Sequence, residues 1–199
     1  MKSIVIITTI CFLMFGCRNE RANDASDQSL VKVQPKTKKS LHLRSFDVVG
    51  GTDSARAELV TEGGISSSGY EGTPHNILWV NLVDGKSRWL LPNNDSIVQV
   101  TEDISTKPEE SAKTPLASLF LVKADVSEQY SITGKLIISS PAGDKQELLS
   151  SDARRLEVWH IAENGQFLIM YAASTDYRVL TVDPASFKVL STKTVSVVK

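Results

Sequence analysis

Residues 77–91 carry the clearest information about the fold, and they read Ile77-Leu78-Trp79-Val80-Asn81-Leu82-Val83-Asp84-Gly85-Lys86-Ser87-Arg88-Trp89-Leu90-Leu91. Two apolar runs flank the pair Asp84-Gly85, and such a pair between apolar runs is a strong local signal for a β-hairpin. We expect a type I′ turn here, in which both central residues have positive φ. Asn164-Gly165 predicts a second hairpin in the same way.

The alternation of apolar and polar residues continues through residues 41–199, where short apolar runs are separated by turn residues. This spacing predicts antiparallel strands. No long stretch keeps a helical period, so helices should be few, and residues 102–115 should form a loop or one short exposed helix. The expected strands are 42–49, 56–61, 76–83, 86–91, 96–101, 117–126, 132–140, 145–149, 155–162, 166–173, 176–183 and 186–197.

Two of these strands are apolar at consecutive positions, namely the runs 77–80 and 167–171. Strands of this kind are typically covered on both faces, so we expect both to be central and buried. The β-branched end of the chain, from Val195 to Val198, should add a closing strand or fray. The sequence therefore predicts an all-β domain built as an antiparallel meander, either a curled open sheet or a sandwich.

Three hairpins in this region look alike: residues 77–91, 135–149 and 177–190. Each has an apolar strand, a tight turn and a second strand that ends in aliphatic residues. This pattern resembles the blades of TolB-type, WD40-like β-propellers. The resemblance implies a partial propeller of about three blades as the alternative fold, because closure of a propeller usually takes at least four.

The N-terminus has the layout of a secretory signal peptide: Lys2, an apolar run from Ile4 to Phe15, and then Gly16-Cys17. The run is shorter than the roughly 20 residues that a helix needs to cross a bilayer. Gly16-Cys17 resembles the lipobox of bacterial lipoproteins, which implies cleavage before Cys17 and attachment of lipid, including palmitate, to that residue. An ordinary cleaved signal and an uncleaved anchor are the alternatives.

Cleavage before Cys17 would divide the chain into a signal peptide (1–16), a lipidated cysteine with a flexible tether (17–40) and one β-rich domain (41–199). It would remove Cys11, and acylation would then protect the one remaining thiol from unwanted disulfides. The tether is expected to be flexible because charged and small polar residues dominate residues 18–40. Arg18, rather than Asp, follows the cysteine, and for a lipoprotein this implies the outer membrane, with the domain in the periplasm.

Loss of residues 1–16 leaves 21 of the 22 basic residues against 23 acidic ones, a formal net charge of −2. This balance gives no sign of nucleic-acid binding. The three histidines, His42, His75 and His160, are isolated, with no second histidine or cysteine at the spacing of a metal site. We therefore expect no metal and no cofactor, and the membrane, reached through the lipid, is the expected partner.

The three tryptophans are the largest apolar anchors: Trp79, Trp89 and Trp159. Trp79 and Trp89 lie five residues either side of Asp84, so they could form a cross-strand pair in the core. Any of the three could instead be exposed for binding, because aromatic residues often anchor partners. Core packing is the expectation that we favour.

Two functions remain open. The favoured hypothesis is a non-catalytic binding or assembly module that recognises an envelope protein or glycan. The alternative is an envelope hydrolase whose candidate residues are His42, His75 or His160 beside a carboxylate. A histidine bonded to a carboxylate in a deep pocket would favour the enzyme, whereas an exposed aromatic patch or an unpaired sheet edge would favour the binding module.

Overall fold

The computed structural model describes residues 40–62, 65–66, 69–70, 72–106, 114–124 and 132–196. All of these residues belong to one compact unit, Lys38–Lys199. The expected signal peptide, the tether up to residue 39 and the middle of the expected break at 102–115 lie outside the described residues. Within the described part, the chain forms strands and turns and no helix.

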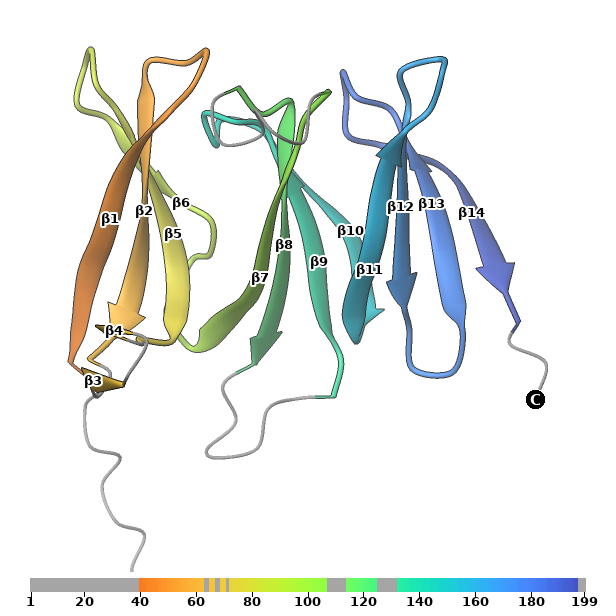
Figure 1. Ribbon diagram of the computed structural model, residues 1–199, viewed down its shortest axis with the longest axis horizontal. Coiled ribbons are helices and arrows are strands. Elements are labelled where there is room, and N and C mark those ends of the chain that lie inside the picture. The colour runs from red at the N-terminus through yellow and green to blue at the C-terminus, as the bar shows by residue number, and fades with distance from the viewer. Residues whose placement is uncertain are drawn as a thin grey trace, which may run out of the picture. The chain divides into compact units, whose positions relative to one another are not determined.

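The strands form three four-stranded antiparallel sheets, which are labelled in Figure 1. The first sheet contains β1 (Leu41–Val49), β2 (Ser54–Thr61), β5 (Pro74–Asn81) and β6 (Ser87–Trp89). The second contains β7 (Ser96–Ile104), β8 (Ala117–Ala124), β9 (Gly134–Ser139) and β10 (Gln146–Ala153). The third contains β11 (Arg155–Ile161), β12 (Phe167–Ala172), β13 (Tyr177–Val182) and β14 (Val189–Val195). A small hairpin of β3 (Ile65–Ser66) and β4 (Gly69–Tyr70) is inserted between β2 and β5.

These sheets confirm the expected all-β antiparallel meander. Each of the twelve expected strands corresponds to one strand of a four-stranded sheet, and strands that are neighbours in the chain are neighbours in the sheet, apart from the β3–β4 insertion. No sheet closes into a barrel. Three sheets of four strands are also what the alternative, a partial propeller of about three blades, requires.

The second sheet forms the centre of the core because both of its faces are covered. One buried cluster joins Ile77 and Trp79 of the first sheet to Phe120 and Val122 of β8. A second cluster joins Leu119 and Leu121 of β8, among others, to the third sheet. Successive residues of a strand point to opposite faces, so β8 contributes to both clusters and is buried from Ala117 to Lys123.

The expectation of two-sided burial is confirmed for the run 77–80 in its first three residues, all of which are buried. It is wrong for the run 167–171. In β12 the side chains alternate, with Phe167, Ile169 and Tyr171 buried and Leu168 and Met170 only half-buried. The third sheet packs on the second through one face, and no other described sheet covers its outer face.

The turns differ from the expected type I′ geometry. Gly85 and Gly165 have the expected positive φ, of 71° and 81°, but neither Asp84 nor Asn164 does. In the first turn the Asn81 N–H donates to the carbonyl oxygen of Lys86 over 2.8 Å, which encloses a four-residue loop, and the Gly85 N–H donates to the carbonyl oxygen of Asn81 over 2.9 Å. The side-chain oxygen of Asn81 accepts from the N–H groups of Val83 and Asp84, and these local bonds favour the longer loop over a two-residue turn.

The three similar hairpins of the sequence occupy equivalent places in the structure. They are β5–β6, β9–β10 and β13–β14, the third and fourth strands of each sheet. The turn at Asn81–Lys86 recurs at Asp183–Lys188, where the Phe187 N–H donates to the carbonyl oxygen of Asp183 over 2.7 Å. The repeat in the sequence therefore corresponds to a repeat of whole sheets.

Candidate functional site

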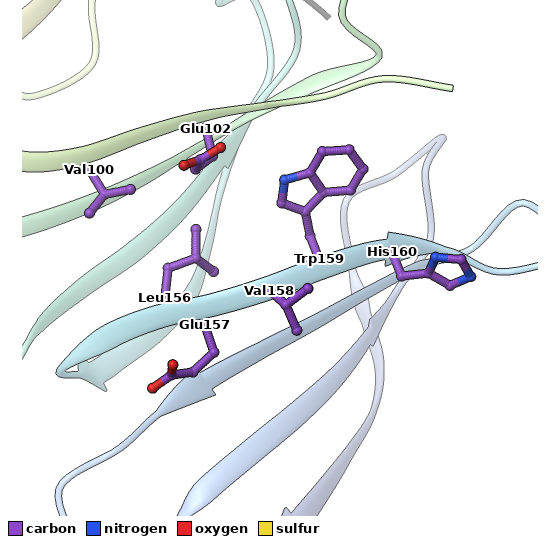
Figure 2. A pocket seen from close by; sticks show the side chains of 7 residues that line it. All are labelled: Val100, Glu102, Leu156, Glu157, Val158, Trp159 and His160. Atoms are coloured by element: carbon purple, nitrogen blue, oxygen red, sulfur yellow. The ribbon is translucent and has the colours of Figure 1, made fainter. Parts of the chain in front are cut away.

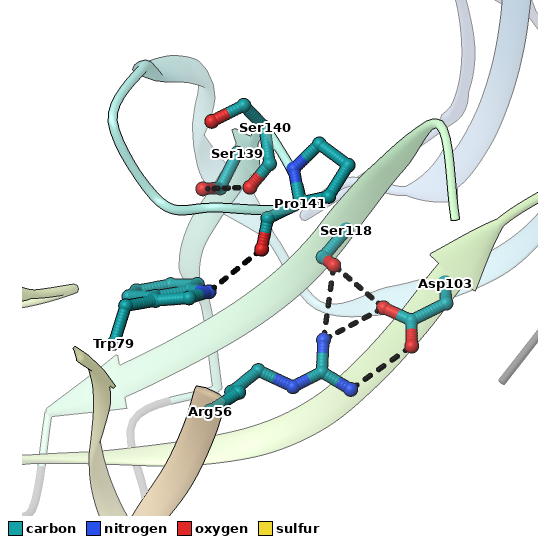
Figure 3. Close-up of polar contacts among 7 residues, drawn as sticks. All are labelled: Arg56, Trp79, Asp103, Ser118, Ser139, Ser140 and Pro141. Atoms are coloured by element: carbon teal, nitrogen blue, oxygen red, sulfur yellow. Dashed lines mark hydrogen bonds and ion pairs between the residues drawn. The ribbon is translucent and has the colours of Figure 1, made fainter. Parts of the chain in front are cut away.

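The first two sheets are joined by Trp79, which belongs to the core. Its side chain is 1% exposed, and its Nε1–H donates to the carbonyl oxygen of Pro141 over 3.0 Å (Figure 3). Its ring meets Phe120 edge to face, with 5.7 Å between the ring centroids. Strand register pairs Trp89 with Leu78 rather than with Trp79, so the two tryptophans point to opposite faces. The possibility of a cross-strand Trp79–Trp89 pair is therefore wrong, and Trp89 is exposed instead.

A polar group also connects these two sheets. Arg56 of β2 donates to both carboxylate oxygens of Asp103 over 2.8 and 2.9 Å, and to the Ser118 hydroxyl over 3.0 Å (Figure 3). Burial alone would lower the pKa of Arg56, but the hydrogen bond and negative charge of Asp103 outweigh it and raise that pKa. Each charged group has its partner, so this triad fixes the packing of two sheets and leaves no free group for chemistry.

The three histidines lie on different strands. His75 is buried in β5, and its Nδ1 lies 2.9 Å from the carbonyl oxygen of Ser96, while its Nε2 has no hydrogen-bond partner among the described residues. His42 is half-buried on β1, and His160 is exposed on β11. In the part of the chain that the structure describes, no three histidine, cysteine or acidic side chains are grouped closely enough to hold a metal ion. The structure thus does not bring the three histidines together.

A groove follows the seam between β7 of the second sheet and β11 of the third. Its first part is a cavity of about 410 Å³, which we call the tryptophan cavity; its lining residues are Val100, Glu102, Leu156, Glu157, Val158, Trp159 and His160. Figure 2 shows Trp159 and Glu102 on one side of β11, with Glu157 on the other. Trp159 is half-buried and packs against the core cluster between the second and third sheets. It is therefore the tryptophan that contributes to a cavity.

The second part of the groove is a cavity of about 870 Å³ that shares Val100 with the first. We call it the basic cavity, because three of its lining residues are cationic: Lys123, Arg154 and Arg155. None of the described residues that line it is acidic, and the remainder are Gln99, Val100, Leu121, Ile132, Ala172 and Tyr177. Its volume is within the range of ligand pockets, roughly 300–1,000 Å³.

Lys123 is the unusual member of this set. It follows the buried run of β8 and is only 8% exposed. No hydrogen bond or ion pair joins its side chain to another described residue. Burial lowers the pKa of Lys123, and the positive charge of Arg154 lowers it further. The chain therefore keeps a cation in a place where its charge is costly.

The two arginines are positioned differently. Both are exposed at the junction of β10 and β11. Arg155 is paired with Glu157 at 2.8 Å, whereas Arg154 makes a long contact of 3.5 Å with the carbonyl oxygen of Ser174. Arg154 is thus the side chain best placed to act with Lys123 on a ligand.

No family model, curated protein or solved structure matches the chain. The part of the chain that the structure describes also has no helix that is long and apolar enough to span a membrane. The groove itself is therefore the feature from which a function can be inferred.

Sequence reasoning identified Trp159 but not the basic cavity. A lysine directly after an apolar run, and an Arg-Arg pair between two strands, were the signals that could have pointed to it. About 30 residues separate Lys123 from Arg154, and strand pairing within the second sheet brings them together, because Val122 pairs with Lys135 and the neighbouring Gly134 pairs with Ala153. Pairing between segments this far apart in the chain has no local pattern in the sequence.

Proposed function

We propose that this chain is a non-catalytic binding module of the bacterial envelope that holds the anionic group of a ligand in the basic cavity. The observation that carries the proposal is the buried Lys123, unpaired among the described residues, in a cavity that also has two arginines and no described acidic residue in its lining. The Lys123 side chain is mostly buried but lines the cavity, so a carboxylate or phosphate in the cavity would form a charge-assisted hydrogen bond with its ammonium group.

The rest of the groove supports a ligand larger than a simple ion. Val100 lines both the basic cavity and the tryptophan cavity, and in the latter Leu156 and Trp159 offer apolar surface. Aromatic and apolar walls with a few fixed polar groups are typical of sites that bind small molecules or chain ends. The anionic part of a glycan, or a carboxylate of an envelope protein, is the class of ligand that this groove suits.

The proposal includes attachment to the membrane through Cys17. The lipid would hold the module at the outer membrane, facing the periplasm, and the tether up to residue 40 would allow it to reach its ligand. Support for this part comes from the signal layout and the resemblance to a lipobox at Gly16-Cys17. Anchoring raises the local concentration of a module near envelope ligands, which makes a modest intrinsic affinity sufficient.

Thermal unfolding of the full chain tests anion binding, with pyrophosphate and citrate as phosphate and carboxylate probes, and sodium chloride at matched ionic strength as the reference. A probe at tenfold its dissociation constant should stabilise the fold by about 1.4 kcal/mol. For a domain of this size the melting temperature should rise by about 3–6 °C. The two probes distinguish a phosphate site from a carboxylate site.

Lys123→Met separates binding from stability. Removal of a buried, unpaired charge should raise the free energy of unfolding without ligand by about 0.5–2 kcal/mol, and it should abolish the response to the probe. The matched control is Lys193→Met, because Lys193 is exposed on β14 and does not line the cavity. An anion response that survives in Lys123→Met, or one that sodium chloride reproduces, would contradict the proposal.

A further inference from the structure

The two end sheets each leave one apolar face without a partner among the described residues. Each sheet has a leading face, which points toward the preceding sheet, and a trailing face, which points toward the following one. Ile77 and Trp79 of the first trailing face pack on Phe120 and Val122 of the second leading face. The second trailing face packs in the same way on the third leading face. The unmatched pair is the leading face of the first sheet and the trailing face of the third.

We propose that two copies of this chain associate head to tail, each placing the trailing face of its third sheet on the leading face of the other's first sheet. Every sheet interface inside the chain already joins a trailing face to a leading face, so the new contacts would continue the existing stack. The product would have six stacked sheets and no unmatched face.

The trailing face of the third sheet is apolar along its middle. Register places Val158, Met170 and Val179 in one row across β11, β12 and β13, and the row ends at Lys193 on the edge strand β14. Val158 is 56% exposed, and Met170 and Val179 are half-buried. Leu168 and Tyr177 flank this row on the same face. A terminal repeat that ended in water would be expected to carry polar residues here.

The leading face of the first sheet is also apolar. Register places Leu43 opposite Leu59, and Val48 opposite Ala55, on the face that points away from the second sheet. The exposed residues of this face lie toward its edges, where Leu43 and Val48 are 40% and 65% exposed and Trp89 is 42% exposed, whereas Ala57, Leu59 and Leu78 in its middle are buried. The paired residues of this face include no charged side chain. On the trailing face of the third sheet the charged residues among the paired ones are Arg155 and Lys193, which lie on the edge strands β11 and β14 and are exposed.

A second copy is the occupant that both faces indicate together. A head-to-tail contact makes either a closed ring or an open fibre, and two copies of three sheets give six, within the roughly four to eight that close a propeller. With four strands roughly 4.8 Å apart and about 20 Å long, each face covers roughly 400 Å². Two contacts would cover about 1,500 Å² in total, the size of a stable specific interface.

The test is the mass of the full chain in mild detergent, measured by light scattering after size exclusion, together with two variants. The expected protein mass is twice the 21.8 kDa of one chain. Leu43→Lys alters only the leading face and Met170→Glu only the trailing face. Because the ring needs both faces of both copies, each variant alone should weaken association at least tenfold. Val179→Glu is a second variant of the trailing face, at a position that lines neither cavity.

Mixing the two variants gives the sharpest result. In the mixed pair one contact is unchanged, and the other holds the introduced lysine and the introduced glutamate on its two sides, so the pair should form again. Val83→Lys is the control, since Val83 is 78% exposed in the β5–β6 turn, away from both faces. Circular dichroism confirms that each variant is folded.

Three results would overturn the proposal. The first is a wild-type chain that stays monomeric at protein concentrations well above a micromolar dissociation constant. The others are association that only one of the two variants weakens, and mixed variants that do not associate. Association through one face alone would indicate a symmetric contact of like faces. A monomeric chain would indicate that a different protein, and not a second copy, binds the two faces.

Discussion

Gly85 and Phe187 occupy the same position in two copies of one turn, although they differ greatly in size. Both have positive φ, 71° for Gly85 and 59° for Phe187, and the N–H of each closes the turn on the first residue of the loop. Positive φ is unfavourable for a residue as bulky as phenylalanine. Phe187 is 4% exposed within the core, and Lys145 lies over its ring at 5.1 Å. Burial of the ring therefore compensates for the strained backbone.

Gly85 has no such compensation, so the change in the free energy of unfolding on its substitution should report only the unfavourable φ. A Cβ atom at Gly85 would have no other atom within 4 Å, which leaves φ as the only obstacle. Gly85→Val should lower the free energy of unfolding by about 1–3 kcal/mol, because a β-branched residue is strained there. Gly85→Asn should cost less than about 1 kcal/mol, since asparagine tolerates this region. Urea denaturation measures both, and equal values for the two variants would contradict this account.

At the scale of single residues the sequence was informative only where the cause is local. The pair Asp84-Gly85 indicated positive φ at the glycine, and this is correct. It did not indicate the loop length, which depends on the side chain of Asn81, nor the positive φ of Phe187, which depends on burial by residues far away in the chain.

Among the elements, the β9–β10 turn forms the receptor for Trp79 of β5. Gly143 lies close against the indole ring, so that a Cβ atom there would be 2.4 Å from Trp79 Cδ2. The carbonyl of Pro141 in the same turn accepts from the indole N–H. One turn of the second sheet therefore holds the largest buried side chain of the first.

Gly143→Ala tests this contact, with Gly85→Ala as its matched control. The two glycines have nearly the same φ, 70° and 71°, so the backbone cost of about 1–2 kcal/mol is common to both. Only Gly143→Ala also overpacks Trp79, which should add about 1–3 kcal/mol to the loss of stability. Chemical denaturation gives the difference. In a Trp79→Leu background the added cost should largely disappear, and its persistence there would show that Trp79 is not the cause.

The positions of the strands were largely predictable from the sequence, but the faces that become buried against another sheet were not. Alternation and turn residues located all twelve strands of the four-stranded sheets, because these signals are local. The run 167–171 was expected to be covered on both sides, yet its outer face is open. An apolar run indicates that both faces of a strand are apolar. The order of sheets in the stack determines which of these faces meets another sheet.

For the whole molecule, the expected lipid on Cys17 makes a direct prediction. Mass spectrometry of the protein extracted from a bacterial host should find residue 17 at the N-terminus with added acyl mass. Cys17→Ser should abolish the acyl mass and release the protein from the membrane fraction, whereas Cys11→Ser, within the expected signal peptide, should change neither. An N-terminus at any other residue, or an unmodified thiol, would contradict the prediction.

The candidate site belongs to this scale as well, which explains why the sequence revealed so little of it. Trp159 could be chosen because tryptophans are rare. Lys123 and Arg154 are ordinary residues in sequence, and they become unusual only when β8, β9 and β10 pair and place both of them in the lining of one cavity.

The order of strands along the chain also governs how the molecule folds. Each sheet is made from consecutive segments, so most pairings form over short loops and should be fast for an all-β protein. The first sheet is synthesised first, but Ile77 and Trp79 gain their cover only when Phe120 and Ile137 have emerged. During that interval the nascent chain exposes apolar surface that is prone to aggregate. Translation pauses or chaperone contacts between residues 90 and 140 would therefore affect the yield of native protein more than those at any later point.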